Sequence, residues 1–145
     1  MTEVAGRKKI KLKFSVWQFV RLMVFMEDVK KSPGSSRDSL VLRQRHEIWR
    51  ALDAKLTGLG KRDAQAFSEL MMEQDVVLED VSLEELDEFV DTAAGVIKSM
   101  RAESNSKQRD EAIAAGLIFE LEEMQTMSNG LKRRQKQLRH KTRSR

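Results

Sequence analysis

The segment from Val16 to Met26 constrains the fold more than any other part of this chain. It reads V-W-Q-F-V-R-L-M-V-F-M, and only Gln18 and Arg21 interrupt its apolar residues. A helix with this sequence is apolar on almost all sides, so neighbouring elements must bury it. Most later segments carry helical patterns that could provide this cover. The sequence therefore predicts a helical domain built around this segment.

As a helix, the same segment would carry apolar side chains around more of its circumference than the neighbours of one helix in a bundle usually cover. Either it is the central helix, wrapped by the others, or one of its sides forms a subunit interface. A second apolar stripe with coiled-coil spacing lies in the last predicted helix. The residues expected at a protein interface are Trp17, Val20, Met23 and Val24 from the first segment and Leu117, Leu121 and Met124 from the last helix.

Residues 9–16 alternate strictly between lysine or serine and apolar residues, as K-I-K-L-K-F-S-V. This period of two is typical of a half-buried strand. A lone strand needs a partner edge, and the only other β-rich run is Val76-Val77-Leu78. The sequence predicts either a two-stranded ribbon with that run or pairing with an edge from another chain.

Capping residues and apolar periodicity predict five helices. Ser15 with Gln18, and Ser82 with Glu85, have the spacing of capping boxes, and Asp63 is a third helix cap. The sequence Ser128-Asn129-Gly130 predicts that the last helix stops there, or that a loose extension resumes at Leu131. The predicted helices cover, in order, about residues 16–31, 38–57, 64–74, 83–102 and 110–127.

These patterns predict an all-α fold: a small bundle of about five helices with a short N-terminal β-strand and a basic C-terminal tail. We expect one helical domain over residues 1–131, followed by a basic tail over 132–145 that would be disordered alone. The chain of 145 residues is long enough for one real core and has no cysteine, which excludes disulfides and thiolate metal sites.

Two features bear on location. No run reaches the roughly 20 apolar residues of a membrane-spanning helix, so no membrane partner is expected. Lysines before the apolar segment, and Glu27-Asp28 after it, do not fit a signal peptide. We expect a cytoplasmic or virion protein.

The net charge of +4 conceals a strong partition along the chain. Residues 63–91 contain eleven acids and no base, whereas residues 131–145 contain eight bases and no acid. Residues 1–13 add five bases against one acid. Such an asymmetric charge distribution bears on the binding partners and on their electrostatic steering to the protein, and it says little about the fold. The acidic block could dock on a basic partner, although a solvated face, or one that neutralises the chain's own basic arms, is the more common interpretation.

The two basic ends predict contact with the phosphates of DNA or RNA. They contain no aromatic side chain that could stack on bases, so this binding would have no sequence preference. The alternatives are a solvated tail, or a patch for an acidic protein. The residues expected to bind nucleic acid are Lys8, Lys9, Lys11, Lys13, Lys132, Arg133, Arg134, Lys136, Arg139, Lys141, Arg143 and Arg145.

Evidence for enzymatic chemistry is weak. His46 lies among charged residues and is better interpreted as a surface residue than as a catalyst. A site for Mg²⁺ among the carboxylates of residues 84–91 is conceivable but unsupported, and no glycine pattern matches a nucleotide-binding loop. We predict no catalytic residue, no metal and no cofactor.

The predicted function is that of a non-enzymatic assembly or adaptor protein of a larger complex, such as a virion, packaging or ribonucleoprotein component. It would contact nucleic acid without sequence specificity and would have a protein partner or form a homo-oligomer. The alternative is a regulatory protein-binding module that uses the apolar first helix or the acidic block of residues 63–91.

Overall fold

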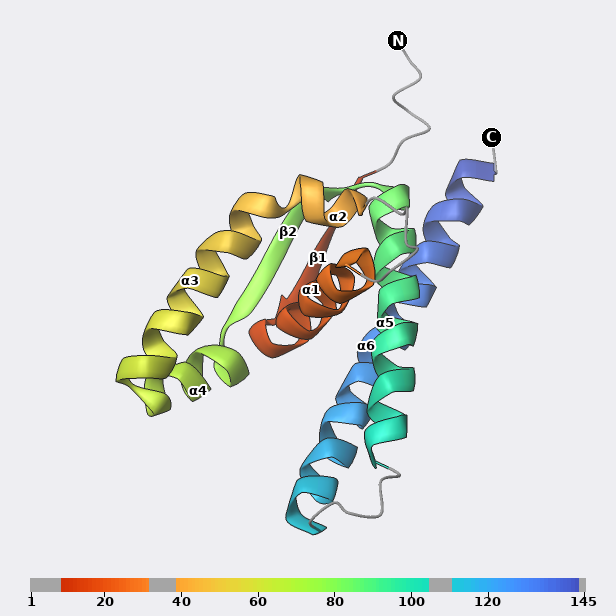
Figure 1. The fold of residues 1–145 in the computed structure, drawn as a ribbon. Coiled ribbons are helices and arrows are strands. Elements are labelled where there is room, and N and C mark those ends of the chain that lie inside the picture. Colours follow the sequence, from red (N-terminus) through yellow and green to blue (C-terminus); the bar gives the residue numbers. More distant parts are fainter. Residues whose placement is uncertain (1–8, 32–38, 105–110, 144–145) are drawn as a thin grey trace.

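The computed structural model describes the backbone of residues 9–31, 39–104 and 111–143, and their side chains except those of 30–31, 104, 111–118 and 140–143 (Figure 1). This part of the chain is mostly helical and begins with a short strand, as predicted, and it contains one two-stranded antiparallel sheet. Its elements are β1 (Ile10–Ser15), α1 (Val16–Lys31), α2 (Leu40–Gln44), α3 (His46–Arg62), α4 (Ala64–Glu73), β2 (Asp75–Val81), α5 (Leu83–Ser104) and α6 (Glu111–Arg143).

Helix α1 occupies the centre of the core. In Figure 1 it crosses in front of β1 and lies beside α5. Phe19, Leu22 and Met23 are completely buried. The ring of Phe14 on β1 lies 6.2 Å from that of Phe19 and 5.2 Å from that of Phe89 on α5. Each such burial contributes about 1.5–3 kcal/mol, so α1 organises the domain as its sequence predicts.

The strand predicted at residues 9–16 pairs within this chain, with β2. Leu12 lies opposite Leu78, and Phe14 lies opposite Val76. The register shifts between Ile10 and Leu12. Asp80, with φ of 53°, lies at this irregularity. The extra residue allows both Leu78 and Val81 to face the core, although an odd spacing would normally place them on opposite faces.

The start of α1 differs in detail from the predicted capping box. The Oε1 atom of Gln18 accepts a hydrogen bond from the Ser15 N–H at 3.1 Å, which is one half of the motif. The Ser15 hydroxyl has no partner among the described residues. Instead, the N–H of Val16 donates to the carbonyl of Gln74 at 3.0 Å, so the residue before β2 completes the helix start.

The predicted second helix is divided in two, so the described chain has six helices rather than five. The division falls at Arg45, which has φ of −111° and ψ of 20°. Its side chain is drawn into an ion pair with Glu85 on α5. The predicted end of this helix near residue 57 is wrong, because α3 continues through Gly58 and Gly60 to Arg62. Helix α4 begins as predicted, with Asp63 accepting from the N–H of Ala66.

Helices α5 and α6 form an antiparallel pair (Figure 1). The Ser82 hydroxyl accepts from the N–H of Glu85, as the second capping box predicts. Of the two alternatives predicted at residues 128–130, the stop is wrong: the helix extends past Leu131, without a break, to Arg143. Leu131 and Leu138 explain this difference: both are buried in the main core cluster, and that burial outweighs the roughly 1 kcal/mol cost of Gly130 inside a helix.

Gly95 of α5 leaves room for the ring of Phe25 on α1. A Cβ atom on Gly95 would lie 2.6 Å from Cζ of Phe25, whereas a Cβ atom on Gly130 would meet nothing closer than 4.0 Å. We expect Gly95→Ala to lower the free energy of unfolding by about 1–3 kcal/mol through overpacking. The matched control Gly130→Ala should raise it by about 0.5–1 kcal/mol. Urea unfolding of both variants tests this, and equal effects would contradict the close approach.

Candidate nucleic-acid interface

Strand β1 presents a lysine face, composed of Lys9, Lys11 and Lys13, to solvent. The alternation of the strand turns Leu12 and Phe14 to the core and leaves these three lysines exposed. Two of them face acids on β2: the ammonium of Lys11 lies 4.0 Å from the carboxylate of Glu79, and that of Lys13 lies 3.9 Å from that of Asp75. All four of these side chains are about half exposed or more. Solvent therefore screens both pairs, and the lysines stay accessible.

The C-terminal half of α6 has two different faces. Leu131 and Leu138 are buried, with Gln135 half-buried between them. Lys132, Arg133 and Lys136 lie on the other side and are exposed. We call these three residues the basic face of α6. Their spacing of one and four residues places them together on the helix surface, and none has an ion-pair partner in the described part of the chain.

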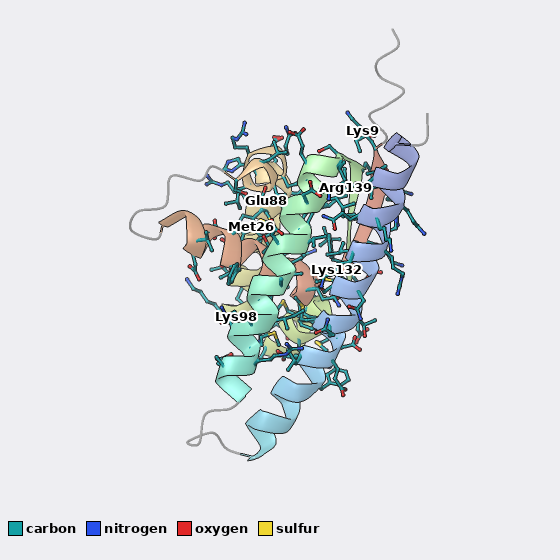
Figure 2. The ribbon with its side chains drawn as sticks, turned by 90° about the vertical axis from the view of Figure 1, so that its right-hand side faces the viewer. Lys9, Met26, Glu88, Lys98, Lys132 and Arg139 are labelled. Atoms are coloured by element: carbon teal, nitrogen blue, oxygen red, sulfur yellow. The ribbon has the colours of Figure 1, made fainter. Side chains whose placement is uncertain are left out.

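The fold brings Lys11 and Lys13 of β1 beside Arg133 and Arg134 of α6. The guanidinium of Arg134 donates a hydrogen bond to the carbonyl of Lys11 at 3.3 Å. Figure 2 shows Lys9, Lys132 and Arg139 along this side. Between β1 and α6 lies a shallow groove of about 420 Å³, whose lining includes Lys11, Lys13, Leu131, Arg133, Arg134 and Gln137. Residues as far apart in sequence as Lys11 and Arg134, 123 positions, thus form one positively charged surface.

Part of the positive charge of α6 is used within the chain. Asp87 on α5 accepts hydrogen bonds from Gln135 at 2.7 Å and from Arg139 at 2.8 Å. Arg139 is about half exposed but is paired with this acid. It therefore differs from the basic face of α6, and its cation is less available for an external anion.

Other carboxylates of the acidic block also hold the fold together. Glu88 accepts from the Ser39 hydroxyl and, at 2.9 Å, from the N–H of Val41, so it ties α5 to the start of α2. Glu85 is buried and pairs with Arg45. Glu84 and Asp91 are exposed. The −11 charge of residues 63–91 is therefore divided between internal contacts and the surface.

The structure separates the residues predicted at a protein interface. Trp17, Met23 and Met124 are buried in the core of the chain itself, so they are corrected from surface to core residues. Val20 and Leu121 are half-buried, and Val24 is exposed. Val20 and Val24 line a hollow between α1, α4 and α5, together with Phe25, Met71 and Met100.

Several predicted residues lie outside the described part. These are Lys8 and Arg145 as whole residues, and the side chains of Leu117, Lys141 and Arg143, whose backbone belongs to α6. Sequence reasoning missed Gln137 and Met127, which line the groove but carry no charge that would single them out. It also missed the contact between Arg134 and Lys11, since nothing in the sequence indicates which helix lies beside β1.

Other kinds of site find little support in the described residues. His46 is exposed in a hollow where Arg43 and Arg50 are balanced by Glu27 and Asp53. Within the same residues, no group of three or more histidines and carboxylates could hold a metal ion.

None of the helices in the described ranges combines the length and the apolar content that a membrane crossing requires. Comparisons of the chain with models of protein families, with curated proteins and with solved structures gave no match. The positively charged surface shared by β1 and α6 is therefore interpreted from its own geometry.

Proposed function

We propose that this protein is a non-enzymatic assembly or adaptor component that contacts nucleic acid through the surface shared by β1 and α6. One observation carries the proposal: two basic segments from opposite ends of the chain lie together, with Lys9, Lys132, Arg133 and Lys136 exposed and free of ion pairs among the described residues. Cations that the fold does not use are available to neutralise phosphates.

The composition of this surface favours contact with the sugar-phosphate backbone alone. Its described residues are lysines, arginines and glutamine around an apolar floor, without an exposed aromatic ring that could stack on a base. Arginine and lysine position a protein on nucleic acid but do not read its sequence through phosphates. The proposed binding is therefore independent of sequence and strongly dependent on salt.

In this proposal, the helical body is a compact bundle that holds the two basic segments at fixed positions relative to each other. Such a component suits a virion, a packaging complex or a ribonucleoprotein, and hence a cytoplasmic or virion location. A protein partner or a second copy would complete the assembly. The exposed Val24, at the hollow between α1, α4 and α5, is a contact point for that partner.

The test is the salt dependence of binding to a random DNA duplex. Replacing Lys132, Arg133 and Lys136 by alanine removes three cations that make no ion pair or hydrogen bond with a described side chain. We expect the slope of log K against log salt to become shallower by about 0.9 for each phosphate contact that is lost, up to about 2.7. Fluorescence anisotropy at several salt concentrations measures this slope.

The matched control replaces Arg50, Lys55 and Lys61 by alanine. These exposed residues lie on α3, at the other side of the molecule from α6 (Figure 1), and the control has the same net charge. We expect it to keep the wild-type slope. Equal slopes for both triple variants would show that binding depends only on net charge, and absence of binding by the wild type would favour the regulatory protein-binding module.

A further inference from the structure

The ladder between β1 and β2 determines which edge of β1 is free. The N–H of Val16 donates to the carbonyl of Gln74, and their neighbours Phe14 and Val76 are paired in the same register. Hydrogen-bonded pairs recur every second residue in an antiparallel ladder, so the even-numbered residues of β1 bond to β2. The backbone groups of the odd-numbered residues Lys11, Lys13 and Ser15 therefore point to the opposite edge.

Two contacts on that opposite edge agree with this assignment. The carbonyl of Lys11 accepts from the guanidinium of Arg134, and the N–H of Ser15 donates to the side chain of Gln18. Side chains thus satisfy two backbone groups of this edge. The N–H groups of Lys11 and Lys13 and the carbonyl of Lys13 have no partner among the described residues. This arrangement leaves part of a strand edge available for pairing.

The groove between β1 and α6 runs along this free edge. Leu12 and Phe14 from β1, and Met127 and Leu131 from α6, give it an apolar floor. Lysines and arginines form its rims. A site for phosphate alone would not need an apolar floor, whereas an extended peptide presents apolar side chains on one face and polar side chains on the other.

On the other edge of β1, strand β2 is an example of a strand whose side chains complement these lysines. Strand β2 reads D-V-V-L-E-D-V, and its Asp75 and Glu79 approach Lys13 and Lys11. Leu78 of the same strand faces the core. A strand on the free edge would meet the same lysines on its outer face and the apolar floor on its inner face, so acidic residues alternating with apolar ones fit both.

We propose that the free edge of β1 binds an extended segment of a partner protein, whose acidic and apolar residues alternate, as a third strand between β1 and α6. Arg134 would leave the Lys11 carbonyl, and its guanidinium would meet an acidic side chain of the incoming strand. This inference does not depend on nucleic-acid binding. Because both ligands would use Lys11, Lys13 and Arg134, they would compete for this side of the molecule.

Hydrogen exchange of the full chain provides a direct test, with a seven-residue peptide that alternates glutamate and valine as the probe. We expect the amides of Lys11 and Lys13 to exchange quickly in the free protein and at least tenfold more slowly with saturating peptide. A peptide of the same composition, with its glutamates and valines in two blocks, serves as the control. Unchanged exchange at both amides, or equal protection by the control peptide, would overturn the proposal.

A pair of variants separates backbone pairing from charge. Lys13→Ala removes the ammonium but keeps the N–H, and Lys13→Pro removes both, at an edge position where proline is tolerated because the N–H is unpaired. We expect Lys13→Pro to bind the alternating peptide about tenfold more weakly than Lys13→Ala. Equal affinities in two folded variants would mean that charge alone attracts the peptide. Should the proline variant fail to fold, the exchange experiment on the wild type still decides the question.

Discussion

Replacing Arg45 by methionine is expected to lower the free energy of unfolding by about 3–5 kcal/mol. The guanidinium of Arg45 donates two hydrogen bonds to the Glu85 carboxylate, from Nε at 2.8 Å and from Nη2 at 2.7 Å. The two side chains are only 12% and 4% exposed. Methionine would leave the Glu85 charge buried with no counterion, which costs far more than the loss of an exposed ion pair.

The consequences extend to the four elements that meet at this pair. Arg45 is the residue that separates α2 from α3, Glu85 lies in the first turn of α5, and a longer contact of 3.4 Å joins Arg45 to the carbonyl of Asp80 at the end of β2. Removal of the guanidinium should therefore loosen the junction between the ribbon and the helices. Urea unfolding followed by circular dichroism measures the loss of stability.

Two controls make this expectation specific. The double variant Arg45→Met with Glu85→Leu replaces both charges by apolar groups, and should recover most of the lost stability or exceed the wild type. Lys13→Ala removes one partner of the exposed pair with Asp75 and should change stability by at most about 1 kcal/mol. A loss below 1 kcal/mol for Arg45→Met would show that the pair is not held in a buried environment.

Local signals in the sequence predicted much of the fold. The alternation of residues 9–16 identified β1, and the hydroxyl of Ser82 caps α5 as its spacing with Glu85 indicated. Leu86, Ala93 and Met100 of α5 are seven residues apart, a spacing typical of one buried side of a helix, and they have almost no exposed surface. Each of these signals depends on residues only a few positions apart, which is why the sequence alone was sufficient.

The features that were not predicted depend on partners far apart in sequence. Glu85 belongs to the acidic block that was interpreted as a solvated face, but Arg45, 40 positions earlier, pairs with it in the interior. Asn129-Gly130 locally favours the end of a helix. However, Leu131 and Leu138 are buried in the core, and their burial stabilises the continuation of α6 beyond Gly130. Local propensities of about 1 kcal/mol are smaller than the burial of one large apolar side chain.

The candidate site shows the same division between local and long-range information. Clusters of lysine and arginine identified both halves of the basic surface, because net charge is visible in a sequence. Their proximity was not visible, since it depends on α6 packing against α5 in a way that places Arg134 beside Lys11. Arg139 pairs with Asp87, whereas Lys136 has no ion pair among the described residues. The sequence did not indicate this difference between the two cations, and only the structure shows it.

A second large effect is expected from the apolar side of the segment first interpreted as a basic tail. Leu131 and Leu138 are 5% and 4% exposed and belong to the main core. Replacement of a buried leucine by alanine typically costs about 2–5 kcal/mol. The two residues lie two helical turns apart, so the costs should be nearly additive, and the double variant should lose about 4–10 kcal/mol. That loss is comparable with the whole stability of a domain.

Thermal unfolding and hydrogen exchange of the double variant Leu131→Ala with Leu138→Ala test this expectation. Its melting temperature should fall sharply, and the amides of α6 beyond Gly130 should lose their protection first. The triple variant of Lys132, Arg133 and Lys136 is the matched control, because it replaces residues of the same turns on the exposed side. It should keep the melting temperature within a few degrees of the wild type.

If the residues beyond Gly130 were an independent tail, the leucine variant would melt like the wild type, and deletion of residues 132–145 would be a clean test of nucleic-acid binding. With Leu138 buried, that deletion removes core packing, the Arg139 contact with Asp87 and the exposed cations together. A loss of binding after deletion would then have two explanations. Only substitutions confined to one side of α6 can separate the stability of the fold from its proposed contact with phosphates.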